Sequence, residues 1–159
     1  MPAIKKILVP TDFSAAADHA LRYACFLADT LHASLCIVHV LENQYLPGGY
    51  MEYYAPPPEY YEQVEREGRK KLEGLLTPDE QARYRTTLVQ RTGGAAHEIL
   101  QYAREQGDID LIVMASHGRG GVARLMMGSV ADKIVRSAPC PVLTIRGPEH
   151  PVEWTNQAA

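Results

Sequence analysis

The fold of this chain is decided by the stretch Leu111-Ile-Val-Met-Ala-Ser-His-Gly-Arg-Gly-Gly-Val-Ala-Arg-Leu-Met-Met-Gly-Ser129. Its apolar beginning, residues 111–114, predicts a buried strand, and a glycine-rich turn follows at once. Gly128-Ser129 then opens a segment with helical spacing. A strand ending in glycines, followed by Gly-Ser at a helix N-terminus, presents backbone N–H groups to phosphate. The stretch therefore indicates a nucleotide-binding domain.

Strand and helix patterns alternate on the N-terminal side of this stretch. Residues 6–9 form a short apolar run that ends at Pro10-Thr-Asp12, as expected for a strand buried on both faces. Ser14 is a good N-cap for the amphipathic helix predicted over residues 15–32. A second strand is predicted over residues 34–40, which completes a βαβ unit with a right-handed crossover.

The alternation continues to the end of the chain. We expect a solvent-facing helix over 59–76, weakened by Gly68 and Gly74, and then a strand over 86–91. A helix carrying Ile99, Leu100 and Ala103 and a strand over 110–114 follow. The last elements expected are a helical turn over 122–127, a helix over 129–138 with Val130, Ile134 and Val135 inward, and a strand over Val142–Ile145. This pattern predicts an α/β fold with an open parallel sheet and helices on both faces. Ligands of such sheets bind beyond the carboxyl ends of the strands, where residues 10–12 and 115–121 lie.

We expect one domain over residues 1–147, followed by a polar tail over 148–159. Residues 43–60 interrupt the pattern with three consecutive prolines, a Gly-Gly pair and several tyrosines, which argues against regular structure. This Tyr/Pro-rich insertion is either a lid or partner surface, or a variable surface insertion.

Composition excludes several classes of partner. The net charge of −3, with acids and bases interspersed, argues against nucleic acid, and no apolar run reaches the length of a membrane span. Residues 4–9 lead into a turn without a signal-peptide pattern, so we expect a cytoplasmic protein. Cys25, Cys36 and Cys140 lack metal-ligand spacing, and we interpret all three as packing residues; a reactive thiol is the alternative for Cys140.

Two common phosphate-binding patterns do not fit the quoted stretch. The P-loop is excluded because the chain contains no Gly-Lys pair. The dinucleotide fingerprint matches Gly118-Arg-Gly-Gly-Val-Ala123, but the next strand runs into Arg146-Gly147 with no acid to bind a ribose hydroxyl. A nicotinamide or flavin dinucleotide is therefore disfavoured.

Five segments together resemble the universal stress protein family: Lys6-Ile-Leu-Val-Pro-Thr-Asp-Phe-Ser14, Val38-His-Val40, Met114-Ala-Ser-His-Gly118, Leu125-Met-Met-Gly-Ser-Val130 and Pro139-Cys-Pro-Val-Leu143. The resemblance spans about residues 5–146 and implies a Rossmann-like sheet of five parallel strands in the order 3-2-1-4-5. In that order, the loops after the first and fourth strands face each other.

The resemblance also implies an ATP site. ATP-binding members carry Gly-x-x-Gly, nine residues and then Gly-[Ser/Thr]; here Gly118, residues 119–127 and Gly128-Ser129 match this pattern. Ala115 stands where the first glycine is expected, and alanine is tolerated there if its φ is negative. The implied nucleotide-binding residues are Pro10, Thr11, Asp12, Val40, Met114, Ala115, Ser116, His117, Gly118, Arg119, Gly120, Gly128, Ser129 and Val130.

Individual roles follow from the resemblance, each with a structural alternative. Asp12 would accept a hydrogen bond from the adenine or ribose, or else cap the helix near Ser14. Val40 would pack on adenine or simply on the strand end. Backbone N–H groups at Gly118 and Gly128 to Val130 would bind phosphates, with Mg²⁺ as a companion for which no protein ligand can be named.

Three functions remain open. The first is an ATP-binding homodimeric stress sensor, paired through Val142–Ile145, with at most slow incidental hydrolysis. The second is a stress-protein fold that has lost its nucleotide, as Ala115 suggests, and acts through protein contacts. The third is an adenylyl- or phosphoryl-transfer enzyme. The third is disfavoured, because the sequence pairs His117 with neither a nucleophile nor an orienting acid and supplies no lysine or carboxylate pair at the site.

Overall fold

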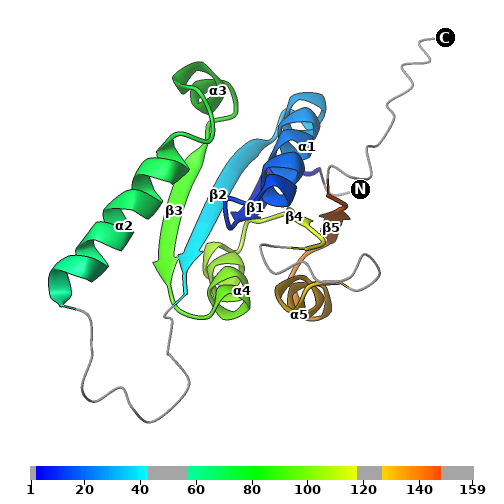
Figure 1. Ribbon diagram of the computed structural model, residues 1–159. Helices are drawn as coiled ribbons and strands as arrows, with labels where there is room; N and C mark the ends of the chain where they lie inside the picture. Colours follow the sequence, from blue (N-terminus) through cyan, green and yellow to red (C-terminus); the bar gives the residue numbers. More distant parts are fainter. Residues whose placement is uncertain (1–2, 43–56, 118–126, 148–159) are drawn as a thin grey trace.

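The computed structural model describes residues 3–42, 57–117 and 127–147. Its sheet has five parallel strands in the order β3-β2-β1-β4-β5 (Figure 1), as expected from the family resemblance. The strands are β1 Lys6–Thr11, β2 Ser34–Leu41, β3 Thr87–Thr92, β4 Leu111–Ala115 and β5 Val142–Ile145. Every predicted strand is present, and β1 continues through Pro10 and Thr11, two residues beyond the predicted end.

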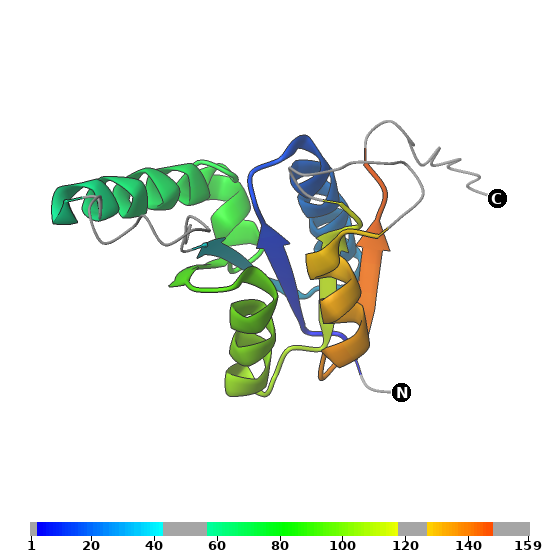
Figure 2. The same ribbon diagram turned by 60° about the horizontal axis from the view of Figure 1, so that its bottom comes forward.

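Helices cover both faces of the sheet, as predicted. They are α1 Ala15–Leu31, α2 Pro58–Glu73, α3 Pro78–Arg83, α4 Ala95–Gln106 and α5 Ser129–Ser137. Figure 2 shows α1 and α2 on one side of the sheet and α4 and α5 on the other. Each side has its own apolar core, because alternate strand residues point to opposite faces: Ile7 and Val9 pack on the α1 side, while Leu8 packs on the α4–α5 side.

The helix between β1 and β2 forms as its sequence predicts. The Ser14 hydroxyl accepts a hydrogen bond from the Ala17 N–H at 3.2 Å, which satisfies one of the unpaired donors of the first turn. The buried positions Ala17, Ala20, Leu21, Ala24 and Ala28 make one continuous stripe against the sheet. His32 then ends the helix in a left-handed conformation, with φ of 55°.

The structure corrects three predictions for the helices. The helix expected over 59–76 begins at Pro58, within the segment 43–60 for which no regular structure was expected, and ends at Glu73; a second helix, α3, follows it. Gly68 does not merely weaken α2: it is buried, and a Cβ there would lie 3.0 Å from Gln90 Oε1, so glycine permits the close approach of α2 to β3. In α5, Val135 is exposed, and Ala131 joins Ile134 on the inner face instead.

Three predictions fall outside the described residues. They concern most of the insertion (43–56), the helical turn over 122–126 and the tail (148–159). None of the helices in the described part of the chain has the length and apolar character needed to cross a membrane.

All three cysteines occupy packing positions. Cys25 and Cys36 are buried, and Cys140 is half-buried against the core on the α4–α5 side. Burial raises the pKa of the Cys25 thiol to about 11 and also raises the pKa values of Cys36 and Cys140. Because the thiolate is the reactive form, these environments favour packing over reactivity at neutral pH.

Candidate functional site

The candidate site lies at the carboxyl ends of β1 and β4, the two strands between which the strand order reverses. β1 pairs with β2 on one side and with β4 on the other, with Leu8 opposite Ile112. The chain leaves β1 toward α1 and leaves β4 toward α5, so the two loops begin beside each other. In open α/β sheets this reversal point is where ligands bind.

The turn after β1 is held by side-chain hydrogen bonds to its own backbone. Thr11 is buried, and its Oγ1 accepts a hydrogen bond from the Phe13 N–H at 3.1 Å. Asp12 Oδ1 accepts one from the Ser14 N–H at 3.0 Å, while Ser14 is itself the N-cap of α1. Asp12 therefore shapes the entry to α1 without being its N-cap, and it stands at the carboxyl end of a central strand.

Ser116 connects β4, β5 and the start of α5. Its N–H donates to the Ile145 carbonyl at 2.8 Å, and its carbonyl accepts from the Gly128 N–H at 2.9 Å. These bonds bring Gly128, twelve residues further along the chain, directly beside the end of β4. Ser116 and Gly128, which stand on either side of the undescribed part of the predicted glycine motif, are therefore in contact.

Helix α5 begins at a glycine beside the end of β4. Gly128 is the N-cap, makes no side-chain cap hydrogen bond, and has φ of −61°, which any residue can adopt. A Cβ added there would lie 3.5 Å from the Ser116 carbonyl oxygen and 3.7 Å from His117 Cα, which is ordinary contact. Among the described residues, neither backbone conformation nor packing requires glycine at this position, and the space beside the Ser116 carbonyl, here called the cradle, has room for a Cβ atom.

The apolar candidates gather on one face, and Ala115 lies on the other. Met114 belongs to the core on the α4–α5 side, and Val40 and Val130 are half-buried against the same core. Ala115 is buried in the core on the α1 side, within β4 and opposite Ile145. Its φ is not positive, so alanine is unstrained there, and its methyl group points away from the face that Val40, Met114 and Val130 share.

His117 has a partner that the sequence did not reveal. Its Nδ1 lies 2.8 Å from the Ser116 hydroxyl, and its Nε2 is buried without a hydrogen-bond partner in the described structure. A buried nitrogen without a hydrogen-bond partner is costly, so each such atom in a folded protein calls for an explanation. The adjacency of Ser116 and His117 was the only available signal for this pair.

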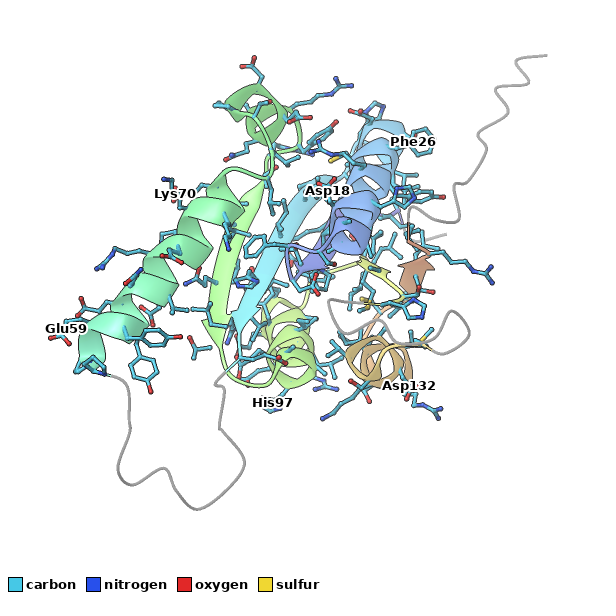
Figure 3. All side chains as sticks on the ribbon, in the orientation of Figure 1. Asp18, Phe26, Glu59, Lys70, His97 and Asp132 are labelled. Carbon is cyan, nitrogen blue, oxygen red and sulfur yellow. The ribbon has the colours of Figure 1, made fainter. Side chains whose placement is uncertain are left out.

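The remaining expected site residues lie partly within and partly beyond the described residues. Gly118, Arg119 and Gly120 lie beyond the described residues, while Pro10 is buried within β1 and Ser129 is exposed at the start of α5. Asp132, labelled in Figure 3, lies on the outer side of α5 and pairs with Arg136 at 3.0 Å. Within the described ranges, no three His, Cys, Asp or Glu side chains are grouped to hold a metal ion.

The sheet order and this edge define the class of protein: a doubly wound α/β domain with its candidate ligand site at the strand-order reversal. A match to the universal stress protein family covers residues 3–146. The universal stress protein YxiE of Bacillus subtilis is 33% identical over 146 residues, covering 89% of this chain and 98% of its own length. The chain therefore belongs to the universal stress protein family.

Solved structures agree with this assignment. The universal stress protein UspA from Lactobacillus plantarum superposes with a TM-score of 0.72 at 25% identity, over 92% of this chain and all of that one. A universal stress protein solved in complex with cAMP has a TM-score of 0.61 at 20% identity, over 91% of this chain and 98% of its own. The second likeness shows the shared fold.

Proposed function

We propose that this chain binds ATP at the carboxyl ends of β1 and β4 and acts as a homodimeric stress-response sensor in the cytoplasm, as one domain over residues 1–147. Asp12 would accept a hydrogen bond from the adenine or ribose, and Val40 would pack on the base. The α5 N-terminus would bind phosphates through the N–H groups near Ser129 and Val130, as helix N-termini commonly do. Any hydrolysis would be slow and incidental to binding.

One observation carries the proposal: among the described residues, nothing requires glycine at position 128. Its φ is ordinary, and there is room for a Cβ against Ser116 and His117. A glycine that the protein does not need, at a helix N-terminus beside the strand-order reversal, is well explained by the close approach of a phosphate. The complex of another family member with cAMP makes an adenine nucleotide the first ligand class to test.

The test is calorimetric titration with ATP, with AMP and cAMP in parallel, using wild type and Gly128→Ala. We expect wild type to bind ATP and Gly128→Ala to bind it at least roughly tenfold more weakly, because the methyl group fills the phosphate cradle. Gly94→Ala is the matched control: Gly94 is also an N-cap glycine without a side-chain cap bond, at α4, and a Cβ there meets nothing within 4 Å. Its ATP affinity should equal that of wild type.

Two outcomes would favour the other functions. No heat and no thermal stabilisation of wild type at millimolar ATP would reject ATP binding and leave a protein that acts through protein contacts. Rapid turnover of ATP that Ser116→Ala abolishes would instead favour an enzyme using the Ser116–His117 pair. Titration with and without Mg²⁺ measures whether the ion accompanies the nucleotide.

A further inference from the structure

A buried histidine on β2 is bonded to the turn that carries Asp12. His39 lies opposite Thr11 in the β1–β2 register, strands that run side by side in Figure 1, and its Nδ1 is 2.9 Å from the Thr11 carbonyl oxygen. A carbonyl oxygen only accepts, so Nδ1 carries the hydrogen and donates it. The Thr11 carbonyl immediately precedes Asp12, so this bond holds the peptide that begins the turn.

The turn itself is conformationally strained. Phe13 has φ of 63°, in the left-handed region that aromatic residues seldom adopt. Its ring contacts the His39 imidazole at a tilt of 42°, with 4.2 Å between centroids, and the Lys71 ammonium lies 5.9 Å from the centroid of the Phe13 ring. Together with the bond from the Phe13 N–H to Thr11 Oγ1, these contacts keep an unfavourable backbone conformation in place.

Packing alone does not account for histidine at this position. On the same face of β2, Leu35 and Ile37 fill the core with aliphatic side chains that carry no desolvation cost. His39 is 9% exposed and brings a polar ring into this environment. What histidine adds there is a donor to the Thr11 carbonyl and an aromatic ring in tilted contact with Phe13.

We propose that His39 is a positioning residue for the nucleotide site. Its bond to Thr11 and its contact with Phe13 hold the turn in the conformation in which Asp12 accepts from the Ser14 N–H and presents its carboxylate to the nucleotide. This inference rests on the proposed ATP binding. It names His39 as a residue that does not contact the nucleotide itself but determines the geometry of Asp12.

Two substitutions separate the two parts of this role. His39→Asn keeps a donor close to the Nδ1 position and removes the ring, and His39→Phe keeps the ring and removes the donor. We expect His39→Phe to weaken binding of both ATP and AMP by roughly tenfold and His39→Asn to recover most of that loss, because the hydrogen bond fixes the peptide before Asp12. Equal affinity of wild type and His39→Phe for ATP would overturn the proposal.

A double-mutant cycle with Asp12→Ala distinguishes positioning from general destabilisation. If His39 acts through Asp12, His39→Phe produces no further loss of ATP affinity once Asp12 is alanine. If the two losses add, His39 does not act through Asp12, and the proposal is wrong. Thermal melting of each variant confirms that the affinities are measured on folded protein.

Amide hydrogen exchange tests the turn without any ligand. In His39→Phe we expect the Phe13 and Ser14 amides to exchange at least roughly tenfold faster, since their acceptors belong to the turn. The Gly93 amide, which donates to the Leu41 carbonyl at the same end of the sheet, is the internal control and should not change. If wild type fails to bind ATP, the proposed function fails, whereas unchanged exchange at Phe13 and Ser14 rejects the role of His39 itself.

Discussion

At the scale of single residues, the structure shows where the methyl group of Ala115 lies. The sequence has alanine at the position where the resemblance implies glycine in ATP-binding members. In the structure Ala115 is part of β4, has no positive φ, and buries its methyl in the core on the α1 side. The residue therefore has a structural reason to be alanine that is independent of ligand binding.

Ala115→Gly should accordingly weaken the fold and leave the ligand site intact. We expect a loss of about 1 kcal/mol in the free energy of unfolding, from the flexibility of glycine in a strand and the lost methyl burial. ATP affinity should remain within about twofold of wild type, because the methyl points away from the face with Val40 and Met114. Urea denaturation and calorimetry measure the two quantities, and a large gain in ATP affinity would show that the methyl does obstruct the ligand.

At the scale of elements, α3 is the helix that periodicity did not predict. It has six residues, too few for an apolar stripe, and no residue in it is buried. Its signal was local: Thr77-Pro-Asp-Glu80 is a capping box, with the Thr77 hydroxyl accepting from the Glu80 N–H and the Glu80 carboxylate accepting from the Thr77 N–H at 2.8 Å. Capping residues rather than hydrophobic spacing therefore determine where this element begins.

The capping box predicts a pH dependence of stability. Hydrogen bonds from the Thr77 backbone and then its side chain hold the pKa of the Glu80 carboxyl below its ordinary value of 4.5. The stabilisation is therefore fully present above the unfolded-state pKa and is lost as the pH falls through the lower folded-state pKa. Glu80→Gln keeps an acceptor but removes the charge, so wild type should exceed it in stability at about pH 7 and lose that advantage at about pH 2.

Urea denaturation of both proteins across this range measures the effect. An equal difference between wild type and Glu80→Gln at both pH values would show that the ionised form contributes nothing. Glu73→Gln, an exposed carboxylate at the end of α2, is the control for the general effect of removing one negative charge.

At the scale of the whole molecule, β5 is an edge of the sheet with a single strand neighbour. The carbonyls of Pro141, just before β5, and of Ile145, its last residue, face β4 and accept hydrogen bonds from the N–H groups of Ile112 and Ser116. Because the N–H and C=O of one residue point to the same side of a strand, those of Thr144 point outward. An edge with outward backbone groups can pair with a second copy, which supports the proposed dimer.

Thr144→Pro should therefore convert a β5-paired dimer to a monomer. Proline removes an outward N–H without breaking the hydrogen bonds to β4, and edge strands accept proline when that N–H faces solvent. Analytical ultracentrifugation should show a dimeric wild type and a monomeric variant with an unchanged circular dichroism spectrum. Thr144→Val, which keeps the N–H and the branched side chain, should remain dimeric, and a dimeric Thr144→Pro would place the interface elsewhere.

Apart from α3, the sequence by itself determined which elements of the described chain exist and where most of them begin and end. Apolar runs, helical spacing and the Ser14 cap are local signals, so the strands and α1 were predicted within about two residues. Motif resemblance added the family and the strand order, which the structure and the comparisons confirm. The ATP site, the dimer and the cellular location remain predictions.

Only the tertiary structure decided how the candidate residues stand toward one another. The hydrogen bond from His39 to Thr11 and the contact of Gly128 with Ser116 join residues that are distant in the chain. No local sequence pattern predicts these contacts or the left-handed conformation of Phe13. Likewise, Val135 has the helical spacing of an inward residue, yet the packing of α5 leaves it exposed. The physical reason is that the contacts between a helix and the sheet it covers depend on residues distant in the chain. The periodicity of a local segment carries no information about those residues.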